Sequence, residues 1–173
     1  MSELPGHPGL FATDFDQLAV GDDFVGAARP ISRSDVDVFA ALTGDHHPLH
    51  TDPEWAAAGP FGEPIVHGLL IVSCAVGSLP LEPERVIALR RIRDVVFKRP
   101  LPVDGVIAGE CRIVDLQPLD SATGLVACRC RVVDRERRLI VRAVLEILWR
   151  RGSGPVDELA AVQVDEEGTR VLL

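Results

Sequence analysis

The sequence lacks the features that mark several classes of protein. No apolar run reaches the ~18 residues that a membrane-spanning helix needs. The first 16 residues have neither the basic start nor the apolar stretch of a secretory signal. The four cysteines show no CxxC spacing, so they predict reduced core residues rather than a disulfide framework. We therefore expect a cytoplasmic protein without a membrane partner.

Basic residues are missing from the start of the chain and gathered later. The first 24 residues contain five acidic residues and no Lys or Arg, and the whole chain has a formal net charge of -8. This balance argues against nucleic acid as a partner, because nucleic acid binds basic surfaces. Basic residues cluster in residues 90–99 and 129–138. Such clusters usually form solvated strand faces, and an anion-binding rim is the alternative.

The length and composition predict one domain. A chain of 173 residues, 47% of them hydrophobic, suits an ordinary domain with a sizeable core. We expect a single domain over residues 1–151, including a short N-terminal extension. Residues 152–173 are rich in Gly and acidic residues, so we expect an acidic, loosely attached C-terminal tail.

Three segments in the first half of the chain carry helix signals. Residues 34–44 place apolar side chains on one helical face, with serines near the start and Gly44 at the end. Residues 52–59 begin with Asp52, a good N-cap, followed by a proline that fits the first helical position. Residues 67–79 are apolar on nearly every face. This pattern predicts a buried helix that is too short to span a bilayer.

After the third helix the apolar pattern changes to that of strands. Apolar positions alternate with others in residues 125–133 and 141–149, as in half-buried antiparallel strands. Residues 85–97 and 106–116 predict two more strands, and residues 23–31 predict an earlier one. One strand, then helices, then about four strands indicates an α+β fold. An antiparallel sheet curled around the long apolar helix would bury that helix.

The segment LTGDHHPLHTDP, residues 42–53, contains three of the five histidines of the chain. Asp45, His46, His47 and His50 are all candidate metal ligands. However, zinc sites on helices use histidines four positions apart, and the proline of this segment favours an extended backbone at the residue before it. Because no distant cluster of Cys or His completes a site, we expect no metal. We also expect no other cofactor.

Asp45 and His50 suggest acid/base chemistry instead. In one helix these two side chains would lie roughly 140° apart, whereas a turn at Gly44 and Pro48 can aim both at one point. A carboxylate and an imidazole that hold one water can take and return protons at neutral pH. The alternative is that Asp45 caps a turn and that His50 only hydrogen-bonds the loop.

The segment FGEPIVHGLL, residues 61–70, supplies a second part of a site. Gly68 stands at the predicted start of the buried helix, where free N–H groups and the positive end of the helix dipole point outward. Such a helix end can serve as an oxyanion hole for a carbonyl oxygen that gains charge. His67 is interpreted as a structural histidine that anchors the turn.

These segments together resemble the MaoC-like hydratases, the family of R-specific enoyl-CoA hydratases. The stretch FAALTGDHHPLHTDPEWAAAGPFGEPIVHGLL is similar to the family signature, in which Asn-Pro-Leu-His-x-Asp-Pro is followed by Pro-Ile-x-His-Gly. The resemblance continues in DQLAVGDDF before it and in VVFKRPLPVDG after it, so that it covers about residues 14–150. It implies a hotdog fold, an antiparallel sheet wrapped around one long helix, and a homodimer.

The resemblance also implies a reaction and its residues. The catalytic Asp and His of the family match Asp45 and His50, and the backbone N–H that holds the thioester matches Gly68. The neighbouring motif positions that we expect to contact the substrate are His47, Pro64 and Val66. The implied activity is that of a hydro-lyase, which adds water reversibly to a trans-2-enoyl thioester and gives an R-3-hydroxyacyl thioester.

Two positions depart from the family pattern. His47 replaces the usual Asn, and the later Gly-Asp appears here as Val103-Asp104-Gly105. We interpret the Asn as a residue that shapes the loop, so catalysis can survive its replacement. Three alternatives stay open: an acyl-thioester hydrolase, a specialised biosynthetic lyase, and a non-catalytic acyl-binding subunit. The presence of both Asp45 and His50 disfavours the last of these.

The thiol carrier of the substrate is expected to be coenzyme A, with an acyl carrier protein as the alternative. Arg93, Lys98 and Arg99 of the first basic cluster are the expected contacts for the phosphates of coenzyme A, because guanidinium and ammonium groups bind phosphate well. The same cluster, which also holds Arg90 and Arg91, could instead meet an acidic carrier protein.

Overall fold

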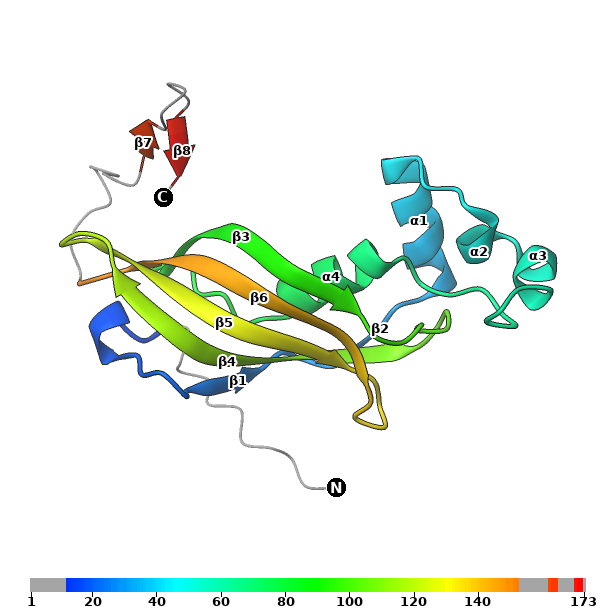
Figure 1. The fold of residues 1–173 in the computed structure, drawn as a ribbon, viewed down its shortest axis with the longest axis horizontal. Coiled ribbons are helices and arrows are strands. Elements are labelled where there is room, and N and C mark those ends of the chain that lie inside the picture. The colour runs from blue at the N-terminus through cyan, green and yellow to red at the C-terminus, as the bar shows by residue number, and fades with distance from the viewer. Residues whose placement is uncertain (1–11, 153–161, 165–169, 173) are drawn as a thin grey trace.

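An antiparallel sheet forms the body of the molecule in the computed structural model, which describes residues 12–152, 162–164 and 170–172 (Figure 1). The sheet has six strands in the order β1-β4-β5-β6-β3, and β2 pairs with β4 beside this path. The strands are β1 (Asp23–Val25), β2 (Arg29–Pro30), β3 (Val86–Phe97), β4 (Val106–Pro118), β5 (Thr123–Val133) and β6 (Leu139–Arg150). The helices are the short 3-10 helix η2 (Phe15–Gln17), α1 (Arg33–Thr43), α2 (Pro48–Thr51), α3 (Pro53–Ala57) and α4 (Gly68–Gly77). The α+β class predicted from the sequence is confirmed.

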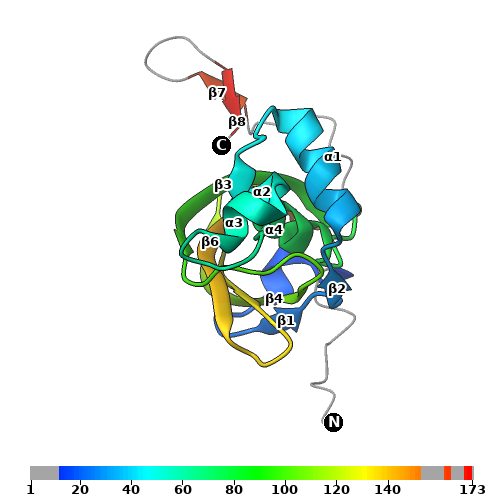
Figure 2. The ribbon, with the colours of Figure 1, turned by 90° about the vertical axis from the view of Figure 1, so that its right-hand side faces the viewer.

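The sheet curves around α4 (Figure 2). Half of the ten residues of this helix are buried, with Ile71 and Ala75 at 2% and 1% exposure. A side chain at Gly109 of β4 would come within 3.3 Å of the carbonyl oxygen of Ala75, so the missing side chain lets the strand approach the helix closely. Burial against the inner face of the sheet therefore explains the apolar sequence of residues 67–79 except at Leu69, which is 65% exposed.

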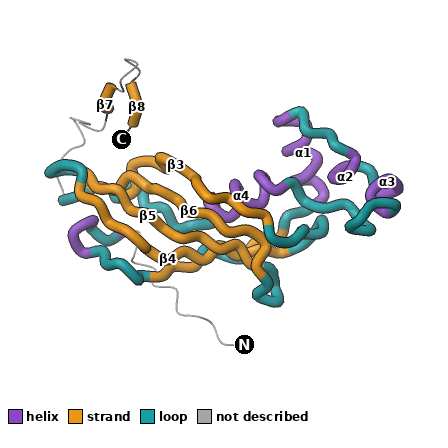
Figure 3. Tube along the Cα trace, in the orientation of Figure 1, coloured by secondary structure: helices purple, strands orange, loops and turns teal. Residues whose placement is uncertain are grey.

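The other helices lie together at one end of the sheet (Figure 3). α1 begins at Ser32, which forms a capping box with Asp35, and it ends at Gly44 with the left-handed backbone φ of 79°. Asp52 caps α3 by accepting hydrogen bonds from two backbone N–H groups. These signals were read correctly from the sequence, whereas the short helix α2 was not predicted.

The predicted early strand, residues 23–31, is wrong in one respect, because it is divided into β1 and β2. Both pieces pair with β4. Between them the chain passes the end of α4, where Gly26 donates to the carbonyl of Gly109 and Ala27 donates to that of Ser78. A side chain at Gly26 would lie 2.6 Å from the hydroxyl oxygen of Ser78. The close passage over the helix end interrupts the strand.

Three further expectations concern the cysteines, the membrane and the tail. All four cysteines are free and buried, as predicted. Within the described ranges no helix is both long and apolar enough to cross a membrane. Most of the predicted tail, residues 152–173, lies outside the described residues. Its described part includes the short strands β7 (Val162–Val164) and β8 (Arg170–Leu172), which pair with each other.

Candidate active site

The loop that follows α1 turns twice and brings Asp45 and His50 to the same cavity. The first turn is made by Gly44, and the second begins α2 at Pro48. His47 is the N-cap of α2, and its Nδ1 accepts a hydrogen bond of 3.1 Å from the backbone N–H of Leu49. His47 thus shapes the loop in the way that a capping Asn would.

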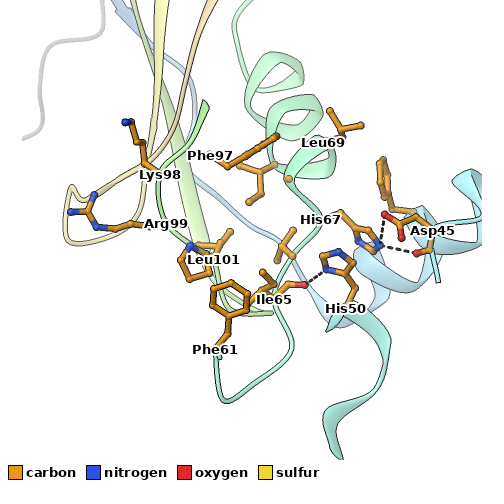
Figure 4. Close-up of a pocket in the computed structure, with 15 residues that line it drawn as sticks. Asp45, His50, Phe61, Ile65, His67, Leu69, Phe97, Lys98, Arg99 and Leu101 are labelled. Atoms are coloured by element: carbon orange, nitrogen blue, oxygen red, sulfur yellow. Dashed lines mark hydrogen bonds and ion pairs between the residues drawn. The ribbon is translucent and has the colours of Figure 1, made fainter. Parts of the chain in front are cut away.

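The cavity has a volume of about 420 Å³ and lies where the loop, the start of α4 and the end of β3 meet (Figure 4). One side carries the polar groups of Asp45, His50 and His67, and the far side carries Lys98 and Arg99. Between them the wall is mainly apolar and includes Phe39, Phe61, Ile65, Val66, Leu69, Ile71, Phe97, Pro100 and Leu101. An elongated ligand with an apolar middle and an anionic end fits this distribution.

His50 is held with a defined ring orientation. Its Nδ1 lies 2.7 Å from the carbonyl oxygen of Ile65. Because a carbonyl oxygen can only accept, this contact places the hydrogen on Nδ1 and leaves the lone pair of the neutral ring on Nε2. Burial lowers the pKa of His50, which favours the neutral ring at pH 7. The backbone carbonyl of the same residue accepts a 2.6 Å bond from Arg33 of α1.

Asp45 is anchored by its backbone more than by its side chain. The Nε2 of His67 lies 3.0 Å from the carbonyl oxygen of Asp45 and 3.9 Å from its carboxylate Oδ2. The carboxylate is 52% exposed, and its Oδ1 accepts a 3.3 Å bond from the N–H of His47. The carboxylate can therefore receive a further donor, such as a water in the cavity.

Gly68 presents the start of α4 to the cavity. It is the first residue of the helix, and the side chain of the preceding His67 makes no capping hydrogen bond. The first N–H groups of a helix have no partner within the helix. The ring of Phe97 covers the α-carbon of Gly68 so closely that a side chain there would lie 2.5 Å from it. Only glycine fits under this ring without displacing it.

The segment before Gly68 is fixed on both sides by backbone hydrogen bonds. Ile65 donates to the carbonyl of Leu49 at 3.2 Å, and Val66 donates to that of Leu101 at 2.8 Å. The carbonyl of Pro64 accepts from Val103 at 3.3 Å. Of the residues expected to contact the substrate, Val66 lines the cavity, whereas Pro64 and His47 are outside the lining.

The basic side chains of the two clusters lie in different surroundings. Lys98 and Arg99 line the cavity. Arg93 does not: it forms a 2.8 Å ion pair with Glu146 on the outer face of the sheet and a second with Asp94. In the later cluster, arginines pair with acidic neighbours, as Arg131 and Arg137 with Glu110 and Arg138 with Asp134. The later cluster is a solvated strand face and hairpin, and the first cluster is divided.

The sequence predicts no metal because of the proline, the expected non-helical backbone and the lack of a distant ligand. The structure corrects the last of these reasons, because His67 joins Asp45 and His50, and one ligand atom from each lies within 4.8 Å of the others. However, Nε2 of His67, which lies 3.9 Å from the carboxylate of Asp45, already donates to the backbone carbonyl of that residue. The absence of a resident metal stays a prediction.

His67 and Arg33 are the polar residues of the site whose contacts the sequence analysis missed. The sequence predicts His67 as an anchor of its own turn, but its ring stacks on that of His50 with centroids 3.8 Å apart and an angle of 26°. The sequence signal that could have identified it as part of the site is the His-Gly motif at a helix start. Nothing in the sequence linked Arg33 to a carbonyl seventeen residues away.

Comparison with known proteins agrees with this geometry. The model of the MaoC like domain matches residues 16–133. The chain is 31% identical to a 3-hydroxybutyryl-CoA dehydratase of Methylorubrum extorquens over 73% of this chain and 80% of that protein. It is 34% identical to an (R)-specific enoyl-CoA hydratase of Aeromonas caviae over 52% of this chain and 67% of that protein.

The fold is also found among solved structures. A Mycobacterium tuberculosis protein described as having a double hotdog fold is 25% identical and superposes with a TM-score of 0.69 over 89% of this chain and 51% of that one. This likeness confirms the hotdog architecture that the sequence predicted. The matched family model covers most of the chain and includes the loop of Asp45 and His50 and the start of α4. The chain therefore belongs to the MaoC-like dehydratase family, whose members include hydratases and dehydratases of acyl thioesters.

Proposed function

We propose that the chain catalyses the reversible addition of water to a trans-2-enoyl thioester, which gives an R-3-hydroxyacyl thioester. The observation that carries the proposal is the shared cavity of Asp45, His50 and Gly68. The cavity brings an acid/base pair close to the start of a helix. The reaction needs the pair to transfer protons and the helix start to stabilise the negative charge on the thioester oxygen. The named activities of the two relatives support the same class of reaction.

The geometry suggests a role for each of these groups in the reaction. Nε2 of His50 accepts a proton from a water that Asp45 also holds, while the water oxygen forms a bond to Cβ. The electrons of the double bond move toward the thioester, whose oxygen gains negative charge beside the N–H of Gly68. The enolate then takes a proton at Cα from the pair. One water is added in total, and the reverse sequence of steps removes it.

The far side of the cavity supports coenzyme A as the thiol carrier. Lys98 and Arg99 lie across the cavity from Asp45 and His50 (Figure 4). A thioester bound at Gly68 with its thiol carrier directed toward this side would bring anionic phosphates to the two cations. Arg93, also expected to contact phosphate, is engaged by Glu146 and is left out of this proposal.

Enoyl absorbance and free thiol should be followed in parallel with purified protein and enoyl-CoA substrates of several chain lengths. Hydration changes the absorbance without releasing thiol, and chiral analysis of the product should give the R isomer. An acyl-thioester hydrolase would release thiol steadily. Thiol release without hydration on every chain length would refute the proposed function.

We also propose a homodimer. In the described sheet, β3 pairs with β6 on one side only. This edge carries half-exposed apolar side chains, Leu89 and Ile92, and α4 exposes 65% of Leu69 nearby. Pairing of two such edges would cover apolar surface and extend the sheet. Sedimentation at micromolar concentration should give the mass of two chains, and a monomer alone would exclude this arrangement.

A further inference from the structure

His67 occupies an unusual position for a histidine with no assigned task. It is 2% exposed, and its Nδ1 is buried without a hydrogen-bond partner within the described structure. Leaving a buried polar atom without a partner costs stability, so an apolar residue would suit this place better if packing were its only role. The retained imidazole therefore needs another explanation.

The contacts of His67 lead to both members of the acid/base pair. Its Nε2 donates to the carbonyl oxygen of Asp45 at 3.0 Å, which ties the loop after α1 to the start of α4. Its ring lies against the ring of His50. It also packs against the ring of Phe39, with centroids 5.1 Å apart. The ring of His67 is thus packed between neighbouring side chains, and it supports one face of the ring of His50.

The four residues from Ile65 to Gly68 position the whole site. Ile65 fixes the ring of His50 through its carbonyl, His67 fixes the backbone of Asp45, and Gly68 lines the cavity at the start of α4. Because these contacts start from one segment of four residues, the distances among the three groups are set locally. Of the three links, the one to Asp45 depends on the side chain of His67 alone.

We propose that His67 is a positioning residue, which holds Asp45 by its carbonyl and supports the ring of His50 so that both groups face a thioester held at Gly68. This inference rests on the proposed function but assigns a role that the function alone does not require. His67 itself need not touch the substrate or carry a proton.

Two substitutions separate the two contacts. His67→Phe keeps a flat ring against His50 and removes the donor to Asp45. His67→Gln places an amide nitrogen near the position of Nε2 and removes the ring. Since small displacements of reacting groups can cost about 100-fold in rate, we expect each variant to lower kcat by roughly 10- to 100-fold. KM should change by less than about twofold, because the groups that bind the substrate remain.

A stability control comes from the same helix. Val72→Ala removes a buried side chain of α4 that does not line the cavity. It should lower the melting temperature and leave kcat unchanged. His67→Phe should show the opposite behaviour, with a melting temperature no lower than that of the wild type and a reduced kcat. Wild-type kcat in both His67 variants would overturn the proposal.

A double-mutant cycle tests whether His67 acts through Asp45. In an Asp45→Asn background, His67→Phe should cost much less than it does alone, because the group that it positions has already lost its function. Equal losses in both backgrounds would contradict the assigned role.

Amide hydrogen exchange tests the role without any measurement of activity. Exchange at residues 44–47 should be faster in His67→Phe, which loses the link to Asp45, than in wild type or His67→Gln. Unchanged exchange would overturn the inference even if hydration is observed. Conversely, faster exchange in a protein whose wild type hydrates no enoyl-CoA would leave the positioning role standing and remove the proposed function.

Discussion

The two ends of the cavity differ in how firmly their charged or titratable groups are held. At one end, Asp45 and His50 are fixed by hydrogen bonds to His67 and Ile65, two residues of one short segment. At the other end, Lys98 and Arg99 are exposed; Arg99 donates to the carbonyl of Leu139 at 3.0 Å, but within the described residues neither has a carboxylate in ion-pair distance. The difference suggests that Asp45 and His50 catalyse the reaction, which requires fixed distances between reacting groups. Lys98 and Arg99 would attract an anionic part of the substrate, which does not require fixed distances.

Substitutions of Asp45 and His50, at the fixed end of the cavity, should have the largest effect on turnover. Asp45→Asn and His50→Gln keep polar side chains and remove the proposed proton carriers. Each should lower kcat for enoyl-CoA hydration by about 10²-fold or more, the usual scale for lost general acid/base catalysis. Because the two groups act together, the double variant should lose far less than the product of the single losses.

The melting temperature of both single variants should stay near that of the wild type, since the loop contributes little to the core. Hydration that persists in both variants would remove these residues from the mechanism. The loop would then be explained by its capping and backbone contacts alone.

Gly68 lies between the two ends and should show the next largest effect. In Gly68→Ala the added methyl group would meet the ring of Phe97 at 2.5 Å, so the ring or the start of α4 must move. A displacement of about 1 Å at the N–H that receives the thioester oxygen can cost up to about 100-fold in kcat. Gly77→Ala, at the other end of the same helix, is the control, because nothing lies within 4 Å of the added group. Equal activity of both variants would count against an oxyanion site at Gly68.

The pH dependence of kcat/KM should report His50. Burial holds its pKa below the ordinary value of about 6.5. The neutral ring, which can accept a proton, therefore predominates at pH 7 and is lost only as the pH falls through this lowered pKa. We expect a constant kcat/KM near neutral pH and a decline of about tenfold per pH unit on the acid side, beginning below pH 6.5. A limb that begins above pH 6.5 would show that another group, or a different protonation state of His50, controls the rate.

Much of the fold could be predicted because its signals are local. The capping residues of α1 and α3, the apolar helix and the alternating strands are written in short stretches of sequence. The division between β1 and β2 could not be predicted, since it depends on a close passage over the end of α4. Likewise, the pairing of Arg93 with Glu146 joins strands β3 and β6, and only the register of the sheet reveals it.

In the site, too, only contacts that depend on local sequence could be predicted. The turn at Gly44 and Pro48 allowed Asp45 and His50 to converge but left a capping loop as the alternative, and the resemblance to the family selected the pair; the structure brings both residues to one cavity. The stacking of His67 on His50 was not predicted, because it depends on how the start of α4 packs against α1 and α2. Contacts within one loop can be read from spacing, whereas contacts between elements require the fold.

The exposed end of the cavity should affect KM rather than kcat. Lys98→Ala and Arg99→Ala should each raise KM for an acyl-CoA by roughly two- to fivefold, which is the range of an exposed ion pair. The effect should shrink as salt is added, because salt screens exposed charges. Arg93→Gln is the matched comparison from the same cluster, and its KM should stay near that of the wild type. A larger change in Arg93→Gln than in the other two would place the phosphates on the outer face of the sheet.

His47→Asn should have the smallest effect of the substitutions, although it lies between Asp45 and His50 in the sequence. The imidazole of His47 caps α2 through Nδ1, and Asn is among the best residues for that task. Its ring also contacts Trp55 edge to face, with centroids 5.4 Å apart, and this contact would be lost.

Since the cap is replaced and the ring lies outside the cavity lining, kcat should stay within about threefold of the wild type, and stability within the ~1 kcal/mol that a cap is worth. His47→Ala is the control, because it removes the cap without supplying another and should be the less stable of the two variants. If His47→Asn abolished turnover as completely as Asp45→Asn, His47 would belong to the chemistry. The fixed end of the cavity would then contain a third proton-carrying group, and a reaction other than simple hydration would become the better explanation of the site.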